Sequence, residues 1–198
     1  MKLYYAPLSR SFRAFWMLEE LGVPYERERV DVRAGAHKQP AYLAVNPSGK
    51  VPALVDRGVA ISESGALCAY LADRFPERGL APALDAPERG AYLRWMFYAV
   101  GVMEPSFTDA VLKRESPNFS VAWGDWKSVA GVVGDALAPG PWLLGPRFSA
   151  ADVMVGSVVQ WGVEVAKLLA GDAALVAYCE RFRARPAFQR ALALDAEN

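Results

Sequence analysis

Residues 46–64 read Asn-Pro-Ser-Gly-Lys-Val-Pro-Ala-Leu-Val-Asp-Arg-Gly-Val-Ala-Ile-Ser-Glu-Ser. Two aliphatic runs at 51–55 and 59–62 lie on either side of Asp56-Arg57-Gly58, which predicts two strands joined by a tight hairpin with glycine at its turn. A helical pattern then occupies 64–75. This stretch therefore predicts the order strand, strand, helix, with a Glu-Ser pair where the sheet passes into the helix.

The sequence before this stretch also switches between strand-like and helix-like patterns. Short alternating patterns of this kind are typical of an α/β domain. Gly22 indicates the end of a helix, because glycine readily takes the left-handed conformation that terminates many helices. The expected elements are a strand at 2–5, a helix at 12–21, a charged edge strand at 25–32 and a short helix at 39–45.

The segment from Pro76 to Pro87 is rich in proline and glycine and has little periodicity, which predicts a linker. The pattern after it is purely helical, with segments expected at 88–112, 119–138 and 149–169 and shorter ones to the end. We therefore expect an α/β domain at 1–76, a linker at 77–87 and an all-helical domain at 88–198.

The composition argues against several classes of function. With 22 Lys+Arg against 22 Asp+Glu in 198 residues, the chain has no excess positive charge for phosphates, which disfavours nucleic-acid binding. Cys68 and Cys179 lack the spacing of a metal site, so we expect reduced core cysteines and no metal. The N-terminus lacks a signal-peptide pattern and the apolar segment 152–169 is interrupted by polar residues. These features predict a cytoplasmic protein with no membrane span.

Two junctions between strands and helices carry candidate binding residues. The loop after the first strand holds Ser9 and Ser11, and in open α/β sheets ligands bind beyond the carboxyl ends of the strands. A serine there can donate a hydrogen bond to an anion, although Ser11 also fits a helix cap. At the second junction, the hydroxyl and helix N-terminus at Ser64 suit a carboxylate and Glu63 suits an ammonium group. The pair predicts a receptor for an amino-acid zwitterion, with simple N-capping by Ser62 or Ser64 as the alternative.

Two further features concern the backbone. Pro52 begins a strand after a glycine turn, which is compatible with a cis peptide bond as well as with an ordinary trans one. Ser149 and Asp152 predict a variant capping box at a helix start, and we assign it a folding role without chemistry.

Together these features resemble the cytosolic glutathione transferase family, over nearly the whole chain. The matching motifs are residues 46–54, Glu63-Ser64, residues 69–76 (Ala-Tyr-Leu-Ala-Asp-Arg-Phe-Pro) and residues 144–152 (Leu-Gly-Pro-Arg-Phe-Ser-Ala-Ala-Asp). The resemblance implies a thioredoxin-like N-terminal domain that binds glutathione, a helical C-terminal domain that supplies the second-substrate pocket, and a homodimer. It also implies that Pro52 follows a cis peptide bond.

The resemblance assigns roles to individual residues. It implies that Glu63 and Ser64 hold the γ-glutamyl ammonium and carboxylate groups. It further implies that the Val51 backbone pairs with the cysteinyl part, next to Pro52. In the theta- and delta-like members, the positions that match His37 and Lys50 reach the glycyl carboxylate.

The catalytic position is assigned by the same resemblance. Ser9 stands four residues before a helix arginine, as the active serine does in theta- and delta-like members, and Ser11 is the alternative. The loop holds no cysteine, which departs from the beta- and omega-like members. The resemblance thus implies a serine hydroxyl that stabilises the glutathione thiolate by a hydrogen bond.

The implied function is a glutathione transferase that conjugates the thiolate to a small, largely apolar electrophile, with glutathione as co-substrate and no other cofactor. The electrophile is expected near Leu8, Trp95, Tyr98 and Val102. The aromatic side chains of Trp95 and Tyr98 equally fit an interdomain core. The alternatives are a glutathione-dependent peroxidase or thiol reductase, and a non-catalytic partner-binding member of the family.

Overall fold

The structure is a computed structural model that describes residues 1–115 and 121–197, and its chain forms two compact units. The first unit comprises Met1–Arg78 together with Arg185–Asn198, and the second comprises Gly79–Ala184. The helical domain expected from the sequence extended to residue 198, whereas the C-terminal segment packs within the first unit.

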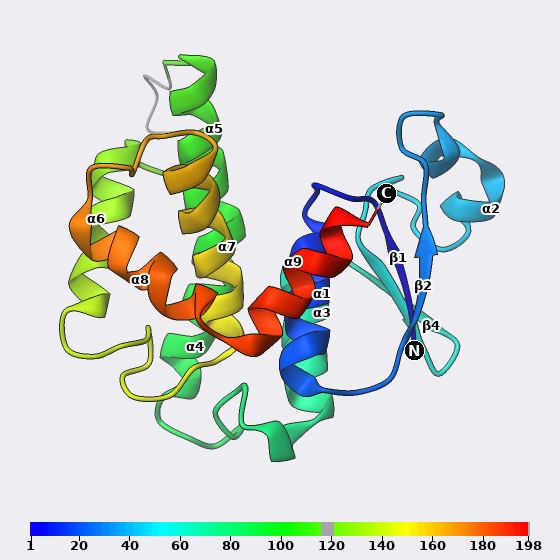
Figure 1. Ribbon diagram of the computed structural model, residues 1–198, viewed down its shortest axis with the longest axis horizontal. Coiled ribbons are helices and arrows are strands. Elements are labelled where there is room, and N and C mark those ends of the chain that lie inside the picture. Colours follow the sequence, from blue (N-terminus) through cyan, green and yellow to red (C-terminus); the bar gives the residue numbers. More distant parts are fainter. Residues whose placement is uncertain (116–120, 198) are drawn as a thin grey trace. The chain divides into compact units, whose positions relative to one another are not determined.

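The first unit contains a four-stranded sheet in the order β2-β1-β3-β4 (Figure 1). β1 pairs in parallel with β2, whereas the β1–β3 and β3–β4 pairs are antiparallel. The strands are β1 Lys2–Tyr5, β2 Glu26–Arg29, β3 Ala53–Asp56 and β4 Val59–Ser62. β2 lies at the sheet edge, as its charges predicted, but it is shorter than the expected 25–32. β3 begins at Ala53 and not at residue 51, because the proline before it donates no ladder hydrogen bond.

Helices cover both faces of this sheet, and successive residues of β1 contact opposite sides. The Tyr5 ring meets Phe15 of α1 with 4.9 Å between centroids, whereas the Tyr4 ring meets Tyr42 of α2 at 5.9 Å. This alternation follows from the period of two in a strand.

In Figure 1, α1, α3 and α9 lie together on one side of the sheet and α2 lies on the other. Their bounds are α1 Ser11–Leu21, α2 Pro40–Leu43, α3 Ser64–Arg74 and α9 Pro186–Ala196. Short 3-10 helices span Ala36–Lys38 and Pro76–Arg78.

α9 is fixed to α1 by both apolar and ionic contacts. The Phe188 ring lies 4.8 Å from Trp16, centroid to centroid. Arg185 donates two hydrogen bonds to Glu20, at 2.6 and 2.7 Å. A bidentate pair of this kind holds the helix in one orientation as well as in contact.

The second unit is helical and has α7 at its centre. Its elements are α4 Arg89–Tyr98, a π-helical turn Ala99–Met103, α5 Glu104–Leu112, α6 Trp126–Leu137, α7 Ala150–Glu164 and α8 Ala173–Arg183. The expected helix at 119–138 corresponds to α6, and its residues 119 and 120 lie outside the described part of the chain. The helix expected at 149–169 ends earlier, at Glu164.

The predicted capping box at the start of α7 is confirmed. The Asp152 carboxylate is buried and accepts hydrogen bonds from the Ser149 N–H at 2.9 Å, the Leu143 N–H at 3.0 Å and the Tyr178 hydroxyl at 2.9 Å. Burial raises the pKa of Asp152 to about 6, and these hydrogen bonds oppose the rise. Asp152 therefore joins three segments of the second unit.

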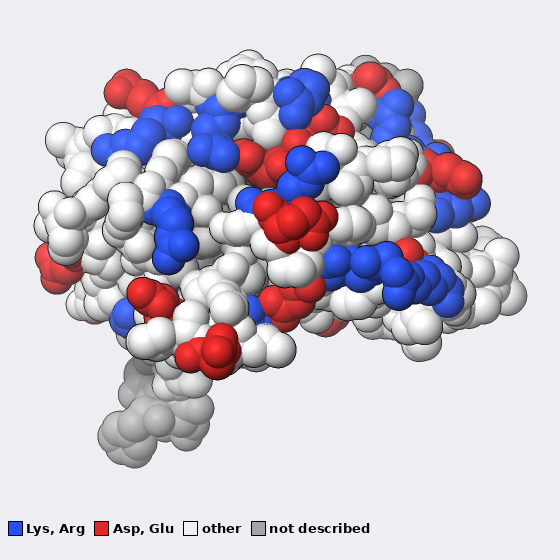
Figure 2. All heavy atoms as spheres, turned by 90° about the horizontal axis from the view of Figure 1, so that it is seen from below, with Lys and Arg blue, Asp and Glu red and all other residues white. Residues whose placement is uncertain are grey.

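On the face shown in Figure 2, acidic and basic side chains are interspersed, in keeping with a formal net charge of zero. Cys68 and Cys179 are both buried free thiols. Across residues 1–115 and 121–197, no helix is long and apolar enough to span a membrane, and no group of three potential metal ligands occurs.

Candidate functional site

The strand register brings three loops of the first unit to one edge of the sheet. Tyr4, near the end of β1, pairs with Ala53 at the start of β3, and Ala53 pairs with Ser62 at the end of β4. The loop after β1, the segment before β3 and the β4–α3 junction therefore meet there. These are the segments that carry Ser9, Val51-Pro52 and Glu63-Ser64.

The Val51–Pro52 peptide bond is cis, as the family resemblance implied. The Lys50 carbonyl before it accepts hydrogen bonds from the Tyr42 hydroxyl at 2.5 Å and from the Asn46 side-chain amide at 2.7 Å. Pro52 is buried and Val51 is half-buried. The segment is thus held by side chains on its own side of the sheet, and Val51 stays accessible.

Glu63 and Ser64 form an uncapped helix N-terminus. Glu63 has a φ of 67° and an exposed side chain, while Ser64 is the first residue of α3. The N-cap residue of α3 is Glu63, which makes no side-chain cap hydrogen bond, so the interpretation as simple N-capping by Ser62 or Ser64 is wrong. The first-turn N–H groups of a helix attract anions, and an exposed carboxylate beside them attracts a cation.

The guanidinium of Arg13 adds positive charge beneath this N-terminus. Arg13 lies on α1, is 5% exposed, and donates a hydrogen bond from Nη1 to the Ser64 hydroxyl at 3.1 Å. In the sequence, Arg13 is only the helix arginine that marks Ser9 as the candidate catalytic serine. No local sequence pattern predicts its contact with Ser64, which lies 51 positions away. Together, Arg13 and the α3 N-terminus favour a carboxylate at Ser64.

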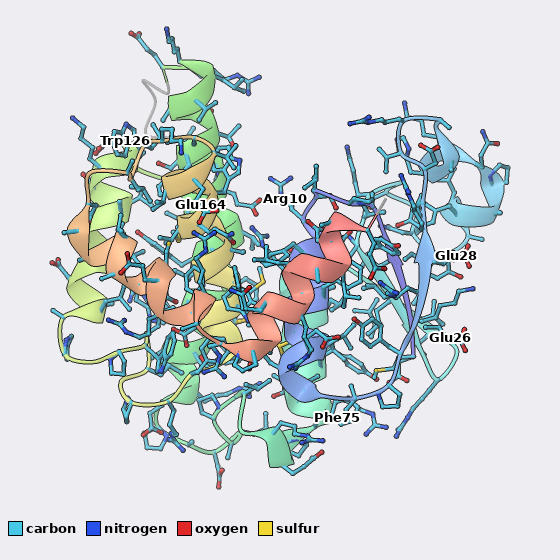
Figure 3. All side chains as sticks on the ribbon, in the orientation of Figure 1. Arg10, Glu26, Glu28, Phe75, Trp126 and Glu164 are labelled. Carbon is cyan, nitrogen blue, oxygen red and sulfur yellow. The ribbon has the colours of Figure 1, made fainter. Side chains whose placement is uncertain are left out.

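The two candidate serines of the β1–α1 loop differ in exposure. Ser9 is half-buried, and its hydroxyl lies 2.7 Å from the Ala6 carbonyl and 3.0 Å from the Ser11 hydroxyl. Ser11 is fully buried and accepts a hydrogen bond from the Ala6 N–H at 3.3 Å. It does not cap α1, whose N-cap is Arg10 without a side-chain hydrogen bond. Ser9 is therefore the less buried of the two serines, and the side chain of its neighbour Arg10 extends away from α1 (Figure 3).

His37 and Lys50 are brought to the same region through the backbone. A Cβ at Gly49 would lie 3.0 Å from the His37 carbonyl oxygen, and Gly49 also has a φ of +61°. Only glycine therefore fits this close approach. The buried Nδ1 of His37 has no hydrogen-bond partner among the described residues, and the Lys50 side chain is exposed.

The four residues expected around a second substrate have different surroundings. Leu8, in the first unit, is 87% exposed. In the second unit, Trp95 is only 2% exposed and its ring lies 5.4 Å from Tyr98, so Trp95 is a core residue. Tyr98 and Val102 are half-buried, and the Tyr98 hydroxyl donates to the Val129 carbonyl at 3.3 Å.

One polar residue near the site was absent from the sequence reasoning. Asp195 of α9 is 7% exposed and accepts a hydrogen bond from the Leu8 N–H at 3.3 Å. The sequence feature that could have identified Asp195 is its spacing, four residues after Ala191 and seven after Phe188. This spacing places a carboxylate on the apolar, buried face of a helix.

Residues 9–74 match the family model described as the N-terminal domain of glutathione S-transferase. The chain is 30% identical to the glutathione S-transferase GstA of Escherichia coli O157:H7, over 98% of both sequences. It is 32% identical to glutathione S-transferase 3 of Zea mays, over 98% of this chain and 93% of that one. The chain belongs to the glutathione S-transferase family.

The solved structures agree with this assignment. A glutathione transferase from Methylococcus capsulatus has a TM-score of 0.81 and 34% identity, and the match covers 98% of each chain. A third sequence relative, the disulfide-bond oxidoreductase YfcG of Escherichia coli K12, is 29% identical over 96% of this chain and 93% of that one. The thioredoxin-like unit and the helical region expected from the resemblance are thereby confirmed.

Proposed function

We propose that the protein binds glutathione at this sheet edge and transfers its thiolate to a small, largely apolar electrophile. The observation that carries the proposal is the convergence of three groups on one edge. They are the hydroxyl of half-buried Ser9, the backbone of half-buried Val51, and the helix N-terminus at Glu63 and Ser64.

Each part of glutathione has a matching group in the first unit. Ser64, with Arg13 beneath it, receives the γ-glutamyl carboxylate, and exposed Glu63 receives the ammonium group. The Val51 backbone pairs with the cysteinyl part as an added strand does. Exposed Lys50 and half-buried His37 supply cationic and polar contacts for the glycyl carboxylate.

The role of Ser9 in this mechanism is limited by its existing hydrogen bond. A thiol with a pKa of about 8.5 is only about 3% ionised at pH 7. A hydrogen bond to the thiolate contributes roughly 1.5–3 kcal/mol, but the hydroxyl gives up its bond to the Ala6 carbonyl, worth roughly 0.5–1.5 kcal/mol. The net gain is about 1.4 kcal/mol, or about one pKa unit, which raises the thiolate fraction at pH 7 to about a quarter.

Two measurements test the proposal. The thiolate absorbance of the glutathione complex, measured against pH, gives the pKa of the bound thiol, and turnover of a chlorodinitrobenzene gives the transferase activity. In the wild type, the bound thiol should titrate about one unit below free glutathione. Ser9→Ala should raise the pKa of the bound thiol by about one unit and lower turnover at neutral pH by about tenfold, with part of the loss recovered at higher pH. In the reaction the sulfur–carbon bond forms, chloride leaves and the thiol proton passes to solvent.

Ser48→Ala is the matched control, because it removes a hydroxyl that donates to Asn46 in the loop before β3. It should leave the pKa of the bound thiol unchanged. A wild-type complex whose thiol titrates like free glutathione would contradict the proposal and would favour a non-catalytic, partner-binding role.

A second candidate function is reduction of disulfides by the same thiolate. It is supported by the 29% identity to a relative named as a disulfide-bond oxidoreductase. Parallel assays of hydroxyethyl disulfide and of the aryl halide separate the two activities. Higher turnover of the disulfide would favour the reductase.

A further inference from the structure

A carboxylate occupies the apolar face of the C-terminal helix. The buried residues of α9 are Ala187, Phe188, Ala191 and Asp195, which recur at helical spacing on the side that packs against α1. Asp195 is 7% exposed. Burying an ionised group without a counter-charge is unfavourable, so an aspartate on this stripe needs a reason other than packing.

Among residues 1–115 and 121–197, the carboxylate has one hydrogen bond and no charged partner. Oδ2 accepts the Leu8 N–H at 3.3 Å, and the buried Oδ1 has no hydrogen-bond partner within the described parts of the chain. The cations that α9 meets or carries are engaged elsewhere. Arg27 pairs with Glu197, Arg185 with Glu20 and Arg190 with Glu19. Burial raises the pKa of Asp195 to about 6, and the Leu8 N–H opposes the rise.

Leu8 is the residue immediately before Ser9, and its backbone is in an unfavourable conformation. Its φ is 53°, in the left-handed region that a branched side chain rarely adopts. Its side chain is 87% exposed, so packing does not hold it there. Such a conformation persists only when its surroundings impose it. The hydrogen bond to Asp195 joins the Leu8 backbone to another element, α9.

We propose that Asp195 is a positioning residue that holds Leu8 in this conformation and thereby sets the direction of the Ser9 hydroxyl. The proposal rests on the proposed function, in which Ser9 donates to the glutathione thiolate. The same carboxylate also carries negative charge near the thiolate, which disfavours ionisation of the thiol. An asparagine separates the two effects, because it keeps an acceptor for the Leu8 N–H and removes the charge.

The experiment compares Asp195→Ala, Asp195→Asn and Arg190→Ala with the wild type. Arg190→Ala is the control, because it removes two hydrogen bonds between α9 and Glu19 without touching Leu8. The measurements are the thiolate titration of the glutathione complex, kcat and KM for the chlorodinitrobenzene, and hydrogen exchange of the Leu8 amide without glutathione.

Asp195→Ala should speed exchange at Leu8, raise the pKa of the bound thiol by about half a unit to one unit, and lower kcat about threefold to tenfold. Asp195→Asn should keep the wild-type pKa of the bound thiol or lower it slightly. Arg190→Ala should lower the thermal midpoint and leave the titration unchanged.

Thermal stability distinguishes positioning from an ordinary structural role. The folded pKa of Asp195, about 6, lies above that of an aspartate in an unfolded chain, so the group favours folding below about pH 4 and loses that contribution as pH rises through about 6. At pH 7, Asp195→Ala should therefore be at least as stable as the wild type while being less active. A less stable variant with an unchanged thiol titration would overturn the proposal.

The remaining outcomes separate this proposal from the proposed function. If the bound thiol has a lowered pKa in the wild type and the same pKa in Asp195→Ala, the role of Asp195 is overturned but the proposed function stands. The same conclusion follows if Arg190→Ala shifts the pKa of the bound thiol as much as Asp195→Ala does. A wild-type thiol that titrates like free glutathione overturns both, even where the Leu8 amide still responds to the substitution.

Discussion

Ser64 contacts the buried Arg13 of α1 and also lies where the ligand carboxylate is expected to bind. Its hydroxyl accepts from buried Arg13, and its position at the start of α3 suits it to a carboxylate. Ser64→Ala should weaken glutathione binding by roughly 1–3 kcal/mol, because the carboxylate loses a donor and the guanidinium loses a partner. Calorimetric titration with glutathione measures this change.

Ser62→Ala is the matched control, since Ser62 ends β4 two residues earlier and has no role in the proposed site. It should bind glutathione as the wild type does. An affinity for glutathione that is the same in Ser64→Ala as in the wild type would show that the carboxylate binds elsewhere.

At the residue scale, the sequence indicates which residue types lie at each strand–helix junction but not how exposed they are. Ser9 and Ser11 are two positions apart and have the same side chain, so only the path of the loop decides that Ser11 is buried against the Ala6 N–H. Arg13 and Asp195 act over 51 and 187 positions of sequence. Contacts of that range depend on tertiary packing, which no local pattern encodes.

Among the secondary-structure elements, two helical glycines have opposite surroundings. In α7, a Cβ at Gly162 would lie 2.8 Å from Leu169 Cδ1 and 3.2 Å from Phe107 Cε2. In α6, exposed Gly131 has open space around its Cβ position. Gly162→Ala should lower the free energy of unfolding by roughly 1–3 kcal/mol through overpacking, whereas Gly131→Ala should raise it by about 0.5–1 kcal/mol through helix propensity. Denaturant titration of both variants measures the two changes.

The two variants are controls for each other, because they make the same substitution within a helix. A stabilised Gly162→Ala would mean that Leu169 moves aside at little cost. A destabilised Gly131→Ala would show that the open space beside α6 is occupied in solution.

The elements with strong local signals are the ones that the sequence predicted well. Gly22 ends α1 with a φ of 63°, and the β3–β4 turn has positive φ at both Arg57 and Gly58, as a tight hairpin requires. The π-helical turn at 99–103 had no such signal, because its apolar residues fit a continuous α-helix equally well.

At the scale of the whole molecule, the two-part organisation was predictable and the position of α9 was not. The sequence pattern changes from mixed to purely helical after the segment rich in proline and glycine that begins at Pro76. This segment predicts the boundary that the structure places after Arg78. The segment from Arg185 onward has the same helical periodicity as its neighbours, so nothing in its sequence assigns it to the first unit. The partners that do so are on α1, and the Arg185–Glu20 and Arg190–Glu19 pairs span 165 and 171 positions of sequence.

The first helix of the second unit, α4, carries apolar side chains on two sides. Tyr92, Trp95 and Met96 are buried, yet Leu93 and Phe97, four residues apart on another face, are 37% and 70% exposed. An exposed apolar face of this kind is typical of an interface, and we expect a homodimer. Light scattering should give twice the chain mass of 21.6 kDa.

Phe97→Glu should shift the measured mass toward that of a single chain, because a dimer would have to bury an unpaired carboxylate. Val165→Glu is the control, since Val165 is an apolar residue of equal exposure, 69%, beyond the end of α7. It should leave the mass unchanged, because α4 keeps its apolar face. A wild-type mass of 21.6 kDa in dilute solution would contradict the dimer, and equal dissociation by both glutamates would move the interface away from α4.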